Sequence, residues 1–264
     1  MTFATAWFTA RAKKVVGGYL FFMPTPLKPF PDAMPHGDLE EILPDTYFVT
    51  GTSRPNFMGQ AWQFSRNMTV LRRGRDLTLV NTVRLDARGL AQLDALGTVR
   101  AVVRLGSFHG MDDAFYLERS DARYFSLAGA PPEGARAPDV LLSPDAEPPV
   151  PDARVFLFET SKVPEAVLWL PTEGGTLIAC DSLQNWVDVD RFFDDDSGTR
   201  MRAFGFIRPA NIGPGWRQAA QPDAVDFHRL AGWSFRHLLP AHGVPILADA
   251  HVQLSATIAR EFGP

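Results

Sequence analysis

The sequence VRAVVRLGSFHGMDDA, residues 99–114, decides the fold. Residues 99–105 form an almost continuous apolar run, which is typical of a strand buried on both faces of a sheet. The chain turns polar at Gly106, and the loop that follows carries His109 and Asp113. Polar side chains next to glycine at the end of a central strand are typical of a binding cleft. We therefore expect a functional site at this end of the strand.

The residues on both sides of this stretch predict the rest of one sheet. Asp86 is suited to cap a helix whose apolar positions are Leu90, Leu93 and Leu96. A hairpin turn at residues 73–75 joins two strands that precede this helix. The strands and helices predicted in this half lie at residues 46–50, 67–72, 76–83, 87–96, 114–119 and 124–127.

The second half of the chain predicts a further set of strands and helices, at residues 154–158, 166–170, 176–180, 223–233, 235–239 and 250–262. Two of these strands end in polar motifs, Cys180-Asp181 and His242-Gly243. Residues 187–222 show little periodicity, and the three aspartates at 194–196 predict a solvated acidic turn. This order favours an α+β fold, a four-layer αββα sandwich, over a doubly wound parallel sheet.

Composition excludes several classes of protein. The chain has 264 residues and a formal net charge of −4, so a nucleic-acid backbone is not the expected partner. The single cysteine, Cys180, excludes an internal disulfide framework and a Cys-rich zinc site. The sequence contains neither a glycine-rich phosphate loop nor a G-x-S-x-G motif. We expect a cytoplasmic protein with no membrane span and a small-molecule substrate or ligand, and we leave a homodimer open.

The composition of residues 1–42 predicts an N-terminal arm or lid that is separate from a domain at residues 43–264. Aromatic side chains are spread through this segment between several prolines, which suits an arm that packs onto the body of the protein. A helix lying on a membrane surface is the alternative, but Gly17-Gly18 would weaken it and few cations support it.

The polar strand ends, in this order and spacing, resemble those of the metallo-β-lactamase superfamily over residues 43–264. That family carries H-x-H-x-D-H after a central strand, a mid-chain His, an Asp at a later strand end and a final His in a G-H-G. Here His109 and Asp113 match the first motif, Asp181 matches the strand-end Asp, and His242 matches the final His.

Three histidines of the family pattern are missing from this sequence. Met111 and Ala114 replace two of them, and Ser161 stands nearest to the place of the third. The resemblance therefore implies a reduced, single-metal site whose ligands are drawn from His109, Asp113, Asp181 and His242. Zinc would suit three such ligands with one open position, and iron or manganese would suit two carboxylates and a histidine.

Three functions follow from this site. The first is a mononuclear metal-dependent hydrolase of an ester, lactone or similar bond, in which His109 acts as general base and Asp181 helps to hold the metal. The second is a metal-free pseudoenzyme that binds a small ligand or a partner on the same fold. The third is redox chemistry at one iron held by His109, Asp181 and His242. Strand alternation predicts that Cys180 faces the core, away from Asp181.

Overall fold

A computed structural model describes residues 30–57, 59–130 and 134–263. The chain divides into two compact units, Met1–Pro31 and Asp32–Pro264, and the description below concerns the second. The predicted arm lies outside the described residues up to position 29, whereas residues 40–43 form the first strand of the large sheet. Within the described ranges, no helix is both long and apolar enough to cross a membrane.

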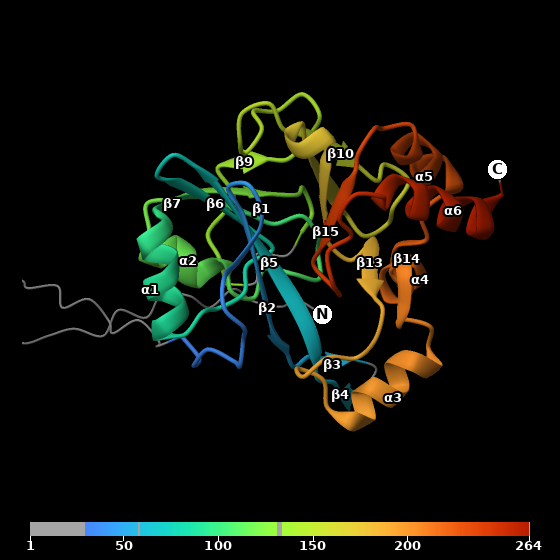
Figure 1. The fold of residues 1–264 in the computed structure, drawn as a ribbon, viewed down its shortest axis with the longest axis horizontal. Coiled ribbons are helices and arrows are strands. Elements are labelled where there is room, and N and C mark those ends of the chain that lie inside the picture. Colours follow the sequence, from blue (N-terminus) through green and yellow to red (C-terminus); the bar gives the residue numbers. More distant parts are fainter. Residues whose placement is uncertain (1–29, 58, 131–133, 264) are drawn as a thin grey trace, which may run out of the picture. The chain divides into compact units, whose positions relative to one another are not determined.

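The large sheet has seven strands (Figure 1). It begins with antiparallel hairpins and continues in parallel through β6-α1-β7 and β7-α2-β8 connections. The predicted strand at residues 99–105 is β7, the fifth in this order, with neighbours on both sides. The strands, in spatial order, are β1 (Glu40–Leu43), β2 (Thr46–Ser53), β5 (Phe64–Arg73), β6 (Asp76–Val80), β7 (Thr98–Val103), β8 (Arg123–Ser126) and β9 (Val140–Leu141).

A four-stranded sheet faces the large one. Its order is β10 (Arg154–Leu157), β11 (Ala166–Leu170), β12 (Thr176–Ala179) and β15 (His237–Pro240). The pairs β10–β11 and β11–β12 are antiparallel, but β12 and β15 are parallel. Two smaller ribbons complete the strands: β13 (Leu183–Trp186) with β14 (Arg208–Ile212), and β3 (Asn56–Phe57) with β4 (Gln60–Ala61).

Six α-helices are described, and their local sequence explains where they begin. The side chain of Asp86 caps α1 by accepting a hydrogen bond from the Gly89 amide, as expected for this residue type. The helices are α1 (Ala87–Leu96), α2 (Asp113–Arg119), α3 (Asp195–Ala203), α4 (Pro214–Ala220), α5 (Ala224–Ala231) and α6 (Ala250–Phe262). A short 3₁₀ turn, η1 (Thr172–Gly174), joins β11 to β12.

Three apolar clusters separate four layers. One cluster lies between the two sheets and includes Val103 and Ile178. The second packs α1 and α2 against the large sheet, and the third packs α4, α5 and α6 against the smaller one. Figure 1 shows the same order, with α1 and α2 at one side, the sheets in the middle, and α5 and α6 at the other. The predicted αββα sandwich is confirmed.

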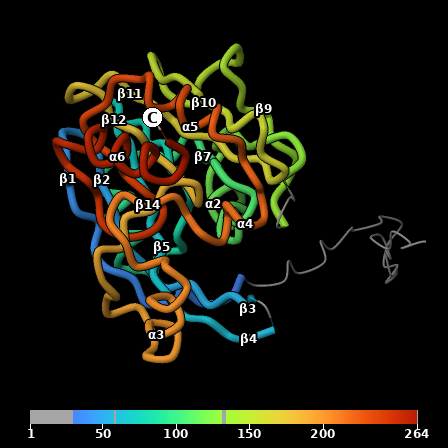
Figure 2. The backbone as a smooth tube through the Cα atoms, turned by 90° about the vertical axis from the view of Figure 1, so that its right-hand side faces the viewer, coloured from blue at the N-terminus to red at the C-terminus, as the bar shows by residue number. Residues whose placement is uncertain are grey.

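One end of the molecule carries elements that the sequence did not predict. The aspartates at 194–196 are exposed, as predicted, but they begin a helix instead of forming a turn: the Asp194 carboxylate accepts a hydrogen bond from the Ser197 amide and caps α3. Arg200 of α3 donates hydrogen bonds to Gln60 and to the carbonyl of Ala61. The helix and the β3–β4 hairpin therefore lie side by side (Figure 2).

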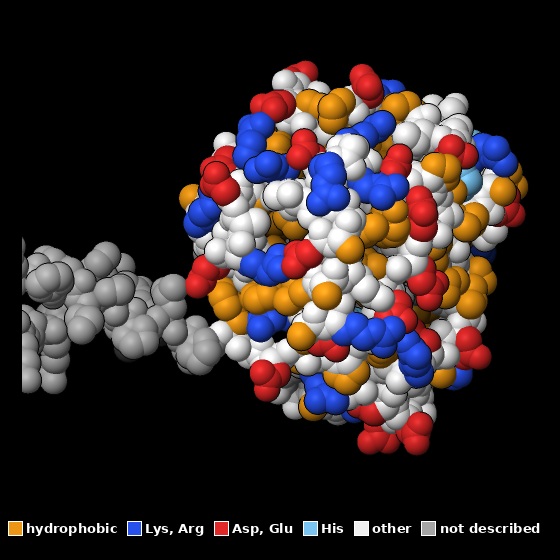
Figure 3. All heavy atoms as spheres, turned by 60° about the vertical axis from the view of Figure 1, so that its left-hand side comes forward, with side chains coloured by type: hydrophobic (Ala, Val, Ile, Leu, Met, Phe, Trp, Pro, Cys, Tyr) orange, Lys and Arg blue, Asp and Glu red, His pale blue; other side chains and the backbone are white. Residues whose placement is uncertain are grey.

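The surface drawn in Figure 3 has a mixed character. Basic and acidic side chains are interspersed there, with apolar side chains between them. Several of the described ion pairs are exposed, such as Arg123 with Glu147 at 2.6 Å. Pairs of this kind contribute little to stability, so the three apolar clusters account for the architecture.

Candidate functional site

Strand register brings Asp181 and His242 together. In the parallel pair β12–β15, Ala179 lies opposite Pro240. Asp181 and His242 each follow two residues later, so they emerge from the same edge of the sheet. The His242 Nε2 atom lies 3.2 Å from Asp181 Oδ1. The Nδ1 atom of His242 lies 3.1 Å from the Ser65 carbonyl oxygen, and as a donor to that oxygen it leaves Nε2 with a free lone pair.

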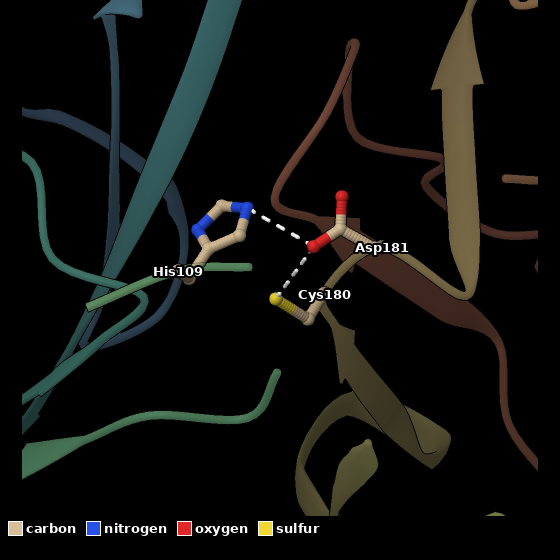
Figure 4. A group of neighbouring side chains, drawn as sticks. All are labelled: His109, Cys180 and Asp181. Carbon is tan, nitrogen blue, oxygen red and sulfur yellow. Dashed lines mark hydrogen bonds and ion pairs between the residues drawn. The ribbon is translucent and has the colours of Figure 1, made fainter. Parts of the chain in front are cut away.

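His109 reaches the same point from the other sheet. Its loop is tied to the smaller sheet by a bridge between Gly106 and Glu165 and by the Ala166 amide, which donates to the Leu105 carbonyl at 2.8 Å. The His109 Nε2 atom lies 3.4 Å from Asp181 Oδ2 and 3.1 Å from His242 Nε2. Figure 4 shows the ring directed at the carboxylate. Three of the four predicted ligands thus converge.

Asp113, the fourth predicted ligand, does not join them. It is the first residue of α2, and its side chain is fully buried. Both carboxylate oxygens accept hydrogen bonds, one from the Thr82 hydroxyl at 2.6 Å and one from the Tyr124 hydroxyl at 2.9 Å. Burial raises the pKa of Asp113 above its ordinary value. These contacts give Asp113 a part in fixing α2 against the large sheet.

The three converging side chains fit a tetrahedral metal. The two Nε2 atoms lie 3.1 Å apart, and each faces a different oxygen of the Asp181 carboxylate, Oδ1 at 3.2 Å from His242 and Oδ2 at 3.4 Å from His109. Nitrogen and oxygen atoms at zinc-ligand distances from one tetrahedral ion lie about 3.3 Å from one another. The hydrogen bond from His242 Nδ1 to a backbone carbonyl is the usual outer support of a metal-binding imidazole. Two imidazoles and a carboxylate suit zinc, and they also suit non-haem iron(II).

The electrostatics of the site favour the protonation states that a metal needs. Burial lowers the pKa of His109 to about 3, against the attraction of the Asp181 carboxylate. Burial alone would raise the pKa of Asp181, but the His109 and His242 rings beside it lower it to about 2. Near neutral pH, His109 is therefore neutral and Asp181 is ionised, as metal ligands must be.

The architecture of this chain is similar to that of solved metallo-β-lactamase structures. The crystal structure of VMB-1 is similar to this chain with a TM-score of 0.59 and 13% identity, and the match covers 84% of this chain and 94% of VMB-1. The metallo-β-lactamase FIM-1 from Pseudomonas aeruginosa, in a mono-zinc form, matches with a TM-score of 0.56 and 14% identity, covering 88% of this chain and 98% of its own. The chain has the metallo-β-lactamase fold.

A third structure supports the same assignment. The metallo-β-lactamase from Erythrobacter litoralis matches with a TM-score of 0.54 and 13% identity, covering 87% of this chain and 96% of its own. No protein-family model and no curated protein sequence matches the chain. At such low identity the likeness concerns the fold, so the chemistry has to be argued from the site itself.

Cys180 behaves differently from the prediction in one respect. It is fully buried in the apolar cluster between the sheets, as strand alternation predicted. However, β12 ends at Ala179, and the turn beyond it brings Cys180 Sγ to 3.6 Å from Asp181 Oδ2 (Figure 4). Ligand atoms of His109, Cys180 and Asp181 all lie within 4.8 Å of one another. Burial raises the pKa of Cys180 well above its ordinary value, so it remains a thiol at neutral pH.

Glu165 is the residue of the site that sequence reasoning missed. It is 1% exposed, and its Oε1 accepts a short hydrogen bond from the Ser182 amide. Through Gly106 on one side and Ser182 on the other, it connects the loop of His109 to the turn of Asp181. Burial and the neighbouring Asp181 raise its pKa well above the ordinary value. A lone acidic residue directly before the apolar strand at 166–170 was the available signal.

A cleft of about 760 Å³ opens over the three converging side chains. Phe108 and Met111, which flank His109 in sequence, are 49% and 45% exposed at this cleft. Ser161, which stands nearest to the missing mid-chain histidine, does not line it, and its hydroxyl hydrogen-bonds to the Val163 carbonyl. The metallo-β-lactamase fold here carries a site built on three side chains, with apolar residues around it.

Proposed function

We propose that this protein is a mononuclear metal-dependent hydrolase of an ester, lactone or similar carbonyl compound. The observation that carries the proposal is the triangle of His109, Asp181 and His242 at the cleft, in which the two Nε2 atoms lie 3.1 Å apart and each lies 3.2–3.4 Å from one of the two Asp181 oxygens. Zinc is the first candidate, with iron and manganese as alternatives. The similar fold of a lactamase in a mono-zinc form is consistent with one metal per chain.

Each of the three residues has a defined part in this proposal. A divalent cation held there would lower the pKa of a bound water and polarise a substrate carbonyl. His109 and His242 would each offer Nε2, and the Ser65 carbonyl orients the second ring. Asp181 presents one oxygen towards each imidazole, so one can hold the metal while the other accepts a proton. We therefore assign the general base to Asp181, since His109 Nε2 is needed as a ligand.

Metal analysis of the purified protein tests the proposal. We would load the metal-free chain with zinc, iron(II) or manganese, and count metal ions by elemental analysis. About one ion per chain is expected, and it should be lost in the double variant Asp181→Ala, His242→Ala. His237→Ala is the matched control, because His237 lies on the same β15 but hydrogen-bonds to the Glu173 carbonyl instead. Metal-dependent hydrolysis of aryl esters and lactones should follow the same pattern.

Two outcomes would contradict the hydrolase. One is the absence of bound metal under every loading condition, and the other is metal that persists in the double variant. The second candidate, a metal-free binding protein, has its own support, because His109 and His242 contact each other directly and need no ion to be paired. Iron chemistry is the third candidate, and it requires iron(II) to bind and to change oxidation state in air.

A further inference from the structure

A second cavity, of about 470 Å³, lies at the opposite edge of the large sheet from the proposed metal site. Its lining includes residues at or near the first positions of the parallel strands β6, β7 and β8, which are Asp76, Arg100 and Arg123. His109, in contrast, follows the last residues of β7. The loop at residues 147–151, which contains three prolines, forms a further wall of the cavity. A cavity of this size can hold a small molecule.

Three arginines from three different strands line this cavity. Arg73 is the last residue of β5, Arg100 lies in β7, and Arg123 begins β8. Two carboxylates, those of Asp76 and Glu147, lie among them, so three positive charges against two negative ones leave one positive charge in excess. The whole chain carries a formal net charge of −4, so the sign at this cavity is opposite to that of the protein. Charges around a concave site attract small ions of the opposite sign.

Two of the three guanidinium groups keep free donors. Arg123 uses both terminal nitrogens on the Glu147 carboxylate, at 2.6 and 3.0 Å. Arg100 contacts the Asp76 carboxylate through Nε alone, at 3.3 Å, which leaves its two terminal nitrogens available. Among the residues that the structure describes, the side chain of Arg73 has no hydrogen-bond or ion-pair partner. An anion in the cavity therefore finds unused N–H donors on Arg73 and Arg100.

Among anions, the lining favours an organic carboxylate. A guanidinium group donates two parallel hydrogen bonds to a carboxylate. The single excess positive charge matches a monoanion, and the carboxylates of Asp76 and Glu147 repel a more highly charged group such as a phosphate dianion. The three prolines of the wall are half-buried or exposed, so their rings are accessible to the apolar part of a ligand.

From these observations we infer that this cavity binds a small organic carboxylate. The carboxylate group pairs with Arg73 and Arg100, and the apolar body of the ligand lies against the prolines of the 147–151 loop. The cavity shares no lining residue with the cleft over the metal site. The inference is therefore independent of the proposed hydrolase, and either one can fail without the other.

Calorimetric titration of the full chain tests this inference. The chain is treated with a chelator, so that no metal ion can bind the carboxylate at the triangle of His109, Asp181 and His242. The probes are 3-phenylpropanoate, its neutral counterpart 3-phenylpropanamide, and phenyl phosphate. We expect the carboxylate to bind at least about fivefold more tightly than the amide, and no more weakly than the phosphate. A smaller preference over the amide, tighter binding of the phosphate, or no detectable binding of the carboxylate would overturn the inference.

Three variants locate the binding site. Arg73→Gln and Arg100→Gln should each weaken binding of 3-phenylpropanoate by at least about threefold and leave the amide unaffected. Arg75→Gln is the matched control, because Arg75 lies in the same hairpin and is exposed like Arg73 but does not line the cavity. Its carboxylate affinity should stay within about 1.5-fold of the parent chain.

All three arginines are exposed, so the variants should fold, and thermal unfolding verifies this. Equal losses of carboxylate affinity in Arg73→Gln and Arg75→Gln would show that the ligand responds to the general charge of the hairpin. That result, or unchanged affinity in both Arg73→Gln and Arg100→Gln, would overturn the assignment of the cavity.

Discussion

Two aspartates follow central strands of this fold, and they end in opposite surroundings. Asp181 meets two imidazole rings at the cleft, whereas Asp113 meets the hydroxyls of Thr82 and Tyr124 inside the large sheet's helical layer. Both are buried. The two aspartates differ in the groups that surround their carboxylates. Imidazole nitrogens can bind a metal together with the Asp181 carboxylate. The two hydroxyls donate to the Asp113 carboxylate and complete a buried hydrogen-bond network instead.

The largest effect is expected from removing the Asp181 carboxylate. In Asp181→Asn, the affinity for zinc should fall by more than about a hundredfold, since even losses outside the ligand shell cost 10–100-fold. Asp113→Asn should keep zinc affinity within about threefold and should instead lower the free energy of unfolding by about 1–3 kcal/mol, because a hydroxyl of the buried network loses its acceptor. Competition with a chromophoric chelator and urea unfolding measure the two quantities.

The opposite effects of the two substitutions on metal binding would contradict the assignment of the ligands. If Asp113→Asn released the metal and Asp181→Asn retained it, the site would have to be rebuilt around α2. The variants are matched, because both aspartates are buried and both substitutions keep the size of the side chain.

Substitution of Glu165 is expected to cause the next largest loss of zinc affinity. Its Oε1 holds the turn after β12 through the Ser182 amide, so Glu165→Ala should weaken zinc binding by about 10–100-fold. Glu165→Gln should restore most of the affinity, because the amide oxygen can still accept this hydrogen bond. The chelator competition provides the measurement, with the unfolding midpoint of the metal-free chain as control. Equal losses in both variants would show that the acidic group itself, rather than its acceptor oxygen, positions Asp181.

The sequence predicted those parts of the site that strand ends determine. Asp181 and His242 each follow an apolar strand directly, and a parallel pair of such strands delivers both to one edge. His109 could be predicted as a candidate because it follows β7 next to glycine. Asp113 follows the same strand, but it lies beyond the loop, within α2, and helix geometry directs it to Tyr124. The direction of the Asp113 side chain therefore could not be predicted from its spacing in the sequence.

Long-range partners explain what the sequence left out. Glu165 gains its role through Gly106 and Ser182, which are both distant from it in sequence. Asp194 caps a helix in a segment without clear periodicity. The sequence did not predict β13, because this short strand pairs with β14 in a separate two-stranded ribbon and belongs to neither the seven-stranded nor the four-stranded sheet. Each of these features depends on tertiary contacts, which local propensity does not encode.

The buried imidazole of His109 predicts a pH effect on the metal-free chain. Its pKa in the folded protein is about 3, below the ordinary 6.5, so between these values the unfolded chain binds a proton that the folded chain does not. Stability should therefore fall as pH drops below 6.5, by up to about 1.4 kcal/mol per pH unit for one proton. The groups that set this pKa beside burial are Asp181, His242, Arg66 and Arg104.

His109→Asn tests that effect by removing the titrating ring. Between pH 6.5 and 4.5, urea unfolding should show a shallower loss of stability in this variant than in the parent chain. In the parent chain Asp181 contributes little in this range, since its lowered pKa, about 2, and the ordinary 3.8 both lie below pH 4.5. Parallel slopes for the two chains would mean that His109 is protonated in the folded state.

Asp194 extends the comparison to an aspartate that faces only backbone, and it should show the smallest effect. Its carboxylate accepts from the Ser197 amide at 2.7 Å and so satisfies one free N–H of the first turn of α3. Asp194→Ala should lower the free energy of unfolding by about 1 kcal/mol. Asp195→Ala is the matched control, because Asp195 is exposed in the first turn and makes no cap. Its loss should cost a few tenths of a kcal/mol, at the low end of the range of about 0.3–1 kcal/mol for a charge that interacts with the helix dipole.

Zinc affinity should be unchanged in both variants, since α3 lies beside the β3–β4 hairpin and contributes no ligand to the triangle. A loss of zinc in Asp194→Ala would instead couple this end of the molecule to the site, through Trp62 and the wall of the cleft that it shares with Met201 of α3.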